Sequence, residues 1–180
     1  MNPATEAISL AAASPADLAT VRRLADAVWH RHYPGIITVE QIDYMLERGY
    51  GEAALGRFLV EPGAGLALAR VGGEPAGFAA WCRADEPATT KLDKLYVLQE
   101  HQRRGVGRRL IALVEEAARA DGAGTLILNV NKRNLRSIDA YRRCGFAVRE
   151  EVVVDIGRGF VMDDFVMAKP LAASPGSELR

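Results

Sequence analysis

The apolar residues of the N-terminal third follow first a strand-like and then a helical spacing. A short apolar run over residues 7–12 predicts a first strand. Ser14 suits an N-cap, and apolar residues recur at helical spacing from there to Tyr33, which predicts a helix. Thr38 predicts the start of a second helix with Gln41 as its capping-box partner, and a third short helix follows. This part of the chain is therefore expected to be mainly helical.

Downstream of residue 64 the pattern changes to short apolar runs separated by turn residues, with two helical stretches among them. The run at 125–130 is almost continuously apolar, as expected for a strand covered on both faces. Hairpin signals alternate with strand–helix–strand connections, so the order predicts a mixed sheet with helices on both sides. The predicted strands cover residues 65–71, 75–83, 91–98, 125–130, 146–156 and 160–169, and the predicted helices cover residues 106–120 and 134–143.

Composition and charge are those of an ordinary globular domain, and they exclude several classes of protein. Apolar residues make up 49% and charged residues 26% of the chain, with 23 charges of each sign. No whole-molecule field therefore attracts nucleic acid or a membrane. The two cysteines and three histidines lack the spacing of a disulfide framework or a metal site. No signal peptide or membrane span is expected, which predicts a cytoplasmic protein.

The sequence Gln-Arg-Arg-Gly-Val-Gly at residues 102–107 is the most informative feature of the chain. It lies between a strand-like run and a strongly helical run. Free amides and the positive dipole end at a helix N-terminus form an anion site, and glycine lets a ligand approach the backbone. No Gly-Lys-Ser/Thr follows, and the third glycine of a dinucleotide fingerprint is missing. The stretch favours a pyrophosphate ligand, although it could also be a simple strand-to-helix connection.

A second group of residues begins at Asn134, a natural N-cap for the helix that follows it. Tyr141 lies seven positions further on, so both side chains fall on one helix face about two turns apart. Taken singly, Asn134 is explained as a cap and Tyr141 as a core aromatic residue.

Three stretches of the chain together resemble the GCN5-related N-acetyltransferase (GNAT) family in kind, order and spacing. They are the strand at 95–97, the turn at 102–107 and the segment from Asn134 through Tyr141 to Phe146. The resemblance implies an α/β (mixed α+β) fold. Its central sheet would be mixed, mostly antiparallel, of about seven strands, splayed in the middle and flanked by about four to five helices. Residues 1–170 would form a single N-acetyltransferase domain, and 171–180 a flexible C-terminal tail. The closing segment 155–169 is similar to a bacterial branch that includes polyamine acetyltransferases of the PaiA type.

The resemblance also implies a function, namely acetyl transfer from acetyl-CoA to a primary amine, with no metal. Tyr141 would be the general acid near the sulfur, and a bulge would bend the strand at Tyr96. Asp93 or a water chain would deprotonate the amine. The 3′-phosphate would meet one of Arg136, Arg142 and Arg143. The cofactor-binding residues implied are Leu95, Tyr96, Val97, Gln102, Arg103, Arg104, Gly105, Val106, Gly107, Arg108, Asn134 and Arg136.

Other interpretations remain open at this stage. The chain could be a non-catalytic acyl-CoA-binding module, and the arginines of the turn could contact RNA phosphates, although no aromatic stacking set accompanies them. The acceptor is expected to be a small-molecule or peptide amine, without nucleic-acid or membrane partners, and the C-terminal strands could form a homodimer. Asp163 and Asp164 predict an exposed pair or, alternatively, a site that attracts a cationic amine. Residues predicted as core, or alternatively as lining of the acceptor pocket, are Trp29, His30, His32, Tyr33 and Tyr44.

Overall fold

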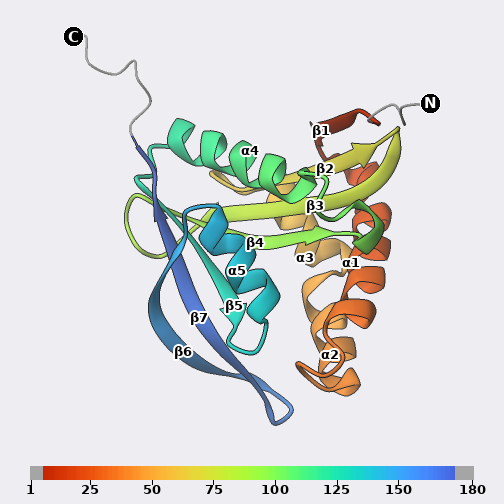
Figure 1. The fold of residues 1–180 in the computed structure, drawn as a ribbon, viewed down its shortest axis with the longest axis vertical. Helices are drawn as coiled ribbons and strands as arrows, with labels where there is room; N and C mark the ends of the chain where they lie inside the picture. The colour runs from red at the N-terminus through yellow and green to blue at the C-terminus, as the bar shows by residue number, and fades with distance from the viewer. Residues whose placement is uncertain (1–5, 173–180) are drawn as a thin grey trace.

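A single seven-stranded sheet organises the computed structural model, which describes residues 6–172 (Figure 1). The spatial order of the strands is first, second, third, fourth, fifth, seventh and sixth, and only the fourth and fifth pair in parallel. The expectation of a mixed, mostly antiparallel sheet of seven strands is confirmed. The strands are β1 (Ile8–Ala12), β2 (Gly65–Val71), β3 (Glu74–Arg83), β4 (Thr89–Val97), β5 (Thr125–Asn131), β6 (Ala147–Gly157) and β7 (Phe160–Pro170).

Five α-helices cover the two faces of the sheet (Figure 1). One face packs against α1 (Leu18–His32), α2 (Val39–Gly49) and α3 (Glu52–Val60), and the other against α4 (Val106–Ala120) and α5 (Leu135–Arg143). Short 3-10 turns precede α1 at Pro15–Asp17 and follow β4 at Gln99–His101. Within residues 6–172, none of the helices has the length and apolar character needed to cross a membrane.

The alternation of side chains along the central strands explains why helices pack on both faces. On β2, Leu66 and Leu68 point to the α1 side, whereas Ala67 and Ala69 point to the α4 side, and all four are buried. The fully buried Phe78 of β3 joins the first group. Burying one such large side chain contributes about 2–3 kcal/mol. A sheet with two apolar faces requires a helical layer on each.

The sheet opens between β4 and β5. Their parallel pairing is limited to residues 89–91 of β4 and 125–127 of β5. Beyond these residues the two strands diverge, as the expectation of a splayed sheet requires, and residues 92–97 of β4 have no strand partner on the β5 side within the described part of the chain. The divergence leaves main-chain groups of β4 available to a ligand.

The bulge in β4 lies at Asp93, so the expectation of a bulge at Tyr96 is wrong. Ala80 of β3 pairs with Lys94 and Trp81 with Leu92, which leaves Asp93 as the extra residue. Tyr96 lies in a regular part of the ladder, opposite Phe78. The neighbouring Gly77 allows a close approach there, because a Cβ at that position would lie 2.6 Å from the Tyr96 carbonyl oxygen.

Two local expectations have different outcomes. Thr38 caps α2 as predicted, since its Oγ1 accepts a hydrogen bond of 3.2 Å from the Gln41 amide. The Gln41 side chain is not part of a capping box: its Nε2 donates to the Val161 carbonyl oxygen of β7 at 3.0 Å.

At the other end of the chain, Leu171 is buried and its N–H donates to the Gly124 carbonyl oxygen at 2.9 Å. Residues 173–180 of the predicted tail lie outside the described residues.

Candidate active site

A cleft of about 420 Å³ occupies the opening between β4 and β5. It passes through the plane of the sheet, because residues of α1 and α2 line it on one side and residues of α5 on the other. The β6–β7 hairpin closes one wall. The lining includes Trp29, His32, Tyr33, Ile37, Met45, Tyr50, residues 91–97 of β4, residues 128–131 of β5, Asn134, Ser137, Tyr141, Ile156, Met162 and Asp164.

The turn at 102–107 leads into α4 close to the end of this cleft. Arg103 and Gly105 have φ angles of +59° and +88°, which place both in the left-handed region. Arg109 N–H donates to the Gly105 carbonyl oxygen at 3.0 Å, whereas no hydrogen bond from the N–H groups of residues 103–108 is found within residues 6–172. Successive unpaired amides at the positive end of a fifteen-residue helix form a concave anion site.

Side chains of the turn connect it to the walls of the cleft. Gln102 Nε2 donates to the Val97 carbonyl oxygen at 3.0 Å, and Arg136 of α5 donates to Gln102 Oε1 at 2.6 Å. The structure therefore brings the end of β4 and the start of α5 together through one glutamine. Arg104 pairs with Glu6 at 2.8 Å, so its guanidinium is already engaged at the surface.

The α5 face predicted to carry Asn134 and Tyr141 does face the cleft. Asn134 is buried and caps α5, since its Oδ1 accepts from the Ser137 amide at 3.3 Å. Tyr141 is half-buried and packs edge-on against Phe146, with ring centroids 5.9 Å apart. Burial raises the pKa of the Tyr141 hydroxyl to about 12, so it stays protonated at neutral pH.

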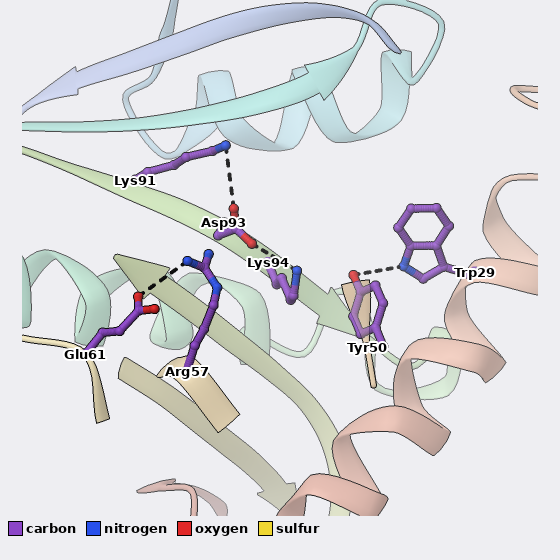
Figure 2. A network of polar contacts seen from close by, with 7 residues as sticks. All are labelled: Trp29, Tyr50, Arg57, Glu61, Lys91, Asp93 and Lys94. Atoms are coloured by element: carbon purple, nitrogen blue, oxygen red, sulfur yellow. Dashed lines mark hydrogen bonds and ion pairs between the residues drawn. The ribbon is translucent and has the colours of Figure 1, made fainter. Parts of the chain in front are cut away.

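Aromatic side chains form the wall on the α1 side of the cleft. Trp29 lies 4.5 Å from Tyr33 and 5.8 Å from Tyr96 between ring centroids, and its Nε1 donates to the Tyr50 hydroxyl at 3.2 Å (Figure 2). Burial, together with neighbouring hydroxyls, raises the pKa of the Tyr33 and Tyr96 hydroxyls well above the usual value. These phenols therefore provide a neutral wall.

The five aromatic and histidine residues weighed as pocket lining divide into two groups. Trp29, His32 and Tyr33 line the cleft. His30 and Tyr44 do not: His30 Nε2 lies 2.9 Å from Asp43 Oδ1 on the surface, and the Tyr44 hydroxyl donates to the Ile156 carbonyl oxygen at 2.5 Å. The latter contact ties α2 to the β6–β7 hairpin.

Asp93, at the bulge, lines the cleft between two lysines (Figure 2). Its carboxylate oxygens lie 2.9 Å from Lys94 Nζ and 3.5 Å from Lys91 Nζ. Burial by itself raises the pKa of this carboxyl, but the positive charges of Lys94, Lys91 and Arg57 outweigh burial and lower the pKa below its usual value. Asp93 is therefore ionised and already neutralised by its neighbours, which makes it a weak proton acceptor.

Asp164 is the residue of the cleft that sequence reasoning placed wrongly. Its neighbour Asp163 is exposed, as expected, and pairs with Lys132 at 2.6 Å. Asp164 itself is only 3% exposed, and its Oδ1 has no hydrogen-bond partner among the described residues. Burial, reinforced by the nearby Asp163 charge, raises the pKa of this carboxyl to about 6. The alternation of side chains along a strand predicts that Asp163 and Asp164 differ in exposure, because adjacent residues of β7 must point to opposite faces.

The cleft therefore combines three features. An open strand edge can accept a linear ligand by main-chain hydrogen bonds, and a helix N-terminus can bind its anionic end. A protonated tyrosine and a buried carboxylate both line the cleft, one on each side of the sheet. The protonated Tyr141 hydroxyl can serve as the proton donor that acyl transfer to an amine requires.

Comparison with known sequences points to one family. The profile described as "Acetyltransferase (GNAT) family" matches residues 24–146. An uncharacterized N-acetyltransferase of Mycobacterium tuberculosis is 27% identical over 138 residues, which cover 77% of this chain and 87% of the relative. Streptothricin acetyltransferase of Streptomyces lavendulae is 37% identical over 97 residues, which cover 54% of this chain and 48% of the relative.

Solved structures show the same fold. The PaiA N-acetyltransferase of Thermoplasma acidophilum, crystallised in complex with coenzyme A, aligns with a TM-score of 0.77 at 23% identity. The alignment covers 91% of this chain and 99% of that protein. At this identity the similarity is one of fold.

Proposed function

Because the chain belongs to the acetyltransferase (GNAT) family, we propose that it transfers an acetyl group from acetyl-CoA to a primary amine held in the cleft between β4 and β5. The chain is thus an N-acetyltransferase, and the acceptor is a small-molecule amine or a peptide N-terminus. The proposal is carried by one observation: the open edge of β4 and the Tyr141 side chain line one cleft, and Gln102, which lines it too, leads directly into the unpaired amides of residues 103–108.

The residues present fit acetyl-CoA along the α5 side of the cleft. Main-chain groups of Leu95 and Val97 lie on the edge of β4 that faces away from β3, where a pantetheine arm can pair as an added strand. The amides of residues 103–108 suit the pyrophosphate, and the amide group of Asn134, which lines the cleft, can contact the arm. Since Gln102 holds the Val97 carbonyl oxygen, its side chain must release that group to the ligand.

We assign the acid role to Tyr141. The thioester supplies an activated acyl carbon, which the amine nitrogen attacks. A main-chain N–H of β4 can stabilise the charge that develops on the carbonyl oxygen, a contribution of about 3 kcal/mol. Tyr141, with a pKa of about 12, holds the proton that the leaving sulfur takes up.

Deprotonation of the amine is assigned to a water chain and not to Asp93. A carboxylate with a lowered pKa that contacts two ammonium groups gains little by accepting a proton. Asp93 instead fixes Lys94 and Lys91 at the bulge and so helps to hold β4 in its splayed position.

The test is calorimetric titration with acetyl-CoA followed by a thiol-release assay across amine classes. We expect binding in the micromolar range and release of CoA with at least one class of amine. Binding without CoA release across a broad panel would favour the alternative function, a non-catalytic acyl-CoA-binding module. No binding at high micromolar acetyl-CoA would contradict both.

A further inference from the structure

Asp164 stands out because it is a buried carboxylate that forms no ion pair with any residue of the described part of the chain. It is 3% exposed, its Oδ1 has no hydrogen-bond partner within residues 6–172, and it lines the cleft. Leaving a buried ionised group unpaired is costly, so the position favours a cationic partner that the protein itself does not supply. Its place on β7 puts it on the α2 side of the sheet, away from Tyr141 and α5.

The other charged side chains that line the cleft form one cluster. Asp93 contacts both Lys91 and Lys94, so these three groups carry a net positive charge of one. Lys94 also lies over the Tyr50 ring, with Nζ 4.6 Å from the centroid. A ligand with several ammonium groups would meet the whole of this positive cluster, whereas a single ammonium at Asp164 would face only Lys91 of it.

The surface around Asp164 is mainly apolar. Met162 and Ile156 of the hairpin and Ile37 and Met45 of the α2 region line the cleft on this side. The aromatic side chains around Trp29, namely Tyr33 and Tyr96, extend this apolar surface. An apolar pocket with one precisely placed charged group selects a ligand with an apolar body and one complementary charge.

From these observations we propose that the acceptor is a small primary amine that carries one positive charge on an apolar body, and that Asp164 receives its ammonium group on binding. The water chain then removes one proton from that nitrogen, which frees its lone pair for attack on the thioester. This inference rests on the proposed function, of which it specifies the acceptor. It departs from the polyamine acceptor that the resemblance of segment 155–169 suggested. Asp164 acts here as a binding residue that determines specificity, and no proton transfer is assigned to it.

The ionisation of Asp164 should control binding. The charged and titratable groups that face it are Asp163 on its own strand, Lys132 after β5, Lys91 on β4 and Tyr33 at the end of α1. Burial and Asp163 raise its pKa, while the two lysines oppose them. Since only the carboxylate attracts an ammonium group, affinity for the amine should fall about tenfold for each pH unit below about 6.

The experiment uses 2-phenylethylamine as the cationic probe, 2-phenylethanol as its neutral counterpart and spermidine as the polycation. Each is titrated by calorimetry into the protein saturated with CoA. We expect wild type to bind phenylethylamine at least tenfold more tightly than phenylethanol at pH 7.5, and more tightly than spermidine. Asp164→Asn should reduce the preference for the amine to less than threefold. Asp163→Asn is the matched control, because it removes the adjacent, exposed carboxylate, and should keep the preference.

CoA affinity is measured first in wild type, Asp164→Asn and Asp163→Asn. This measurement distinguishes a failure of the present inference from a failure of the proposed function. Equal CoA affinity with loss of amine selectivity in Asp164→Asn is the expected result. Equal CoA affinity with unchanged selectivity, or tighter binding of spermidine than of phenylethylamine to wild type, would overturn the inference and leave acetyl transfer standing. The pH profile of wild type gives a readout that needs no variant: amine affinity independent of pH between 5 and 7 would also overturn it.

Discussion

His32 Nε2 donates a hydrogen bond of 3.1 Å to Asn134 Oδ1, which joins the end of α1 to the start of α5 at the cleft. The same oxygen accepts the N-cap hydrogen bond from the Ser137 amide. Asn134 therefore has a structural role through its oxygen, while its Nδ2 has no hydrogen-bond partner among residues 6–172. The Asn134 oxygen thus forms the cap, whereas the Asn134 nitrogen is the atom proposed to contact the pantetheine arm.

Replacing Asn134 in two ways distinguishes these roles. Asn134→Asp keeps an N-cap oxygen but loses the Nδ2 donor, so stability should change by less than about 0.5 kcal/mol. Acetyl-CoA affinity should fall about tenfold, the effect of one lost hydrogen bond. Asn134→Ala should lower affinity and also destabilise the protein by about 1 kcal/mol. Calorimetry and urea unfolding measure the two effects; full acetyl-CoA affinity in Asn134→Asp would rule out the contact.

Tyr141→Phe should slow turnover by about 10²- to 10⁴-fold, the usual range for loss of a general acid. Its effect on acetyl-CoA affinity should be less than threefold. Within the described residues the hydroxyl makes no hydrogen bond, so thermal stability should be nearly unchanged. Steady-state kinetics and calorimetry check this. Parallel losses in turnover and in affinity would show that Tyr141 binds the cofactor and does not act as the acid.

Gly107 offers a test of the main-chain anion site. A Cβ at this position would lie 3.8 Å from Val97 Cγ2, an ordinary contact, and the residue is in the first turn of α4. Proline is tolerated in a first turn but lacks the N–H group, whereas alanine keeps it. We expect Gly107→Pro to bind acetyl-CoA about tenfold more weakly than Gly107→Ala, with thermal unfolding as the control for folding. Equal affinities would exclude this amide from the site.

Asp93→Asn tests whether this carboxylate is a base or an ion-pair partner. Its removal leaves Lys94 with a side chain only 12% exposed and without its closest counter-ion. We expect a loss of about 2 kcal/mol in the free energy of unfolding, which the double variant Asp93→Asn/Lys94→Met should largely recover. The pH dependence of turnover should be unchanged. If Asp93 were the general base, turnover would instead fall by about two orders of magnitude while stability stayed intact.

Asp164 should reduce stability at neutral pH. Its folded-state pKa of about 6 lies above the unfolded value near 3.8, so the folded protein holds the proton more tightly. Stability contributed by this group is present below about pH 4, falls as pH rises to about 6, and is absent above it. The total loss is about 3 kcal/mol. Urea unfolding of wild type and Asp164→Asn should therefore diverge between pH 4 and 7 in favour of the variant. Parallel profiles would show that Asp164 is not desolvated.

Much of the secondary structure could be predicted from the sequence, because it depends on local periodicity. The strand positions, the caps at Thr38 and Asn134, and the face shared by Asn134 and Tyr141 all follow from spacing within a few residues. The glycine turn at 102–107 was equally visible, since helix N-termini and left-handed residues leave a local signature. These elements also carried the resemblance that the family match confirmed.

Tertiary structure alone decided which side chains face the cleft between β4 and β5, and which of their charges are paired. The bulge falls at Asp93 and not at Tyr96 because it depends on the register with β3. Gln41 contacts β7, 120 residues away, instead of completing a cap. Asp93 is neutralised by lysines while Asp164 is buried without a partner. Hydrogen-bond partners and desolvation depend on which distant strands and helices pack together, and the spacing of residues along one chain does not specify those neighbours.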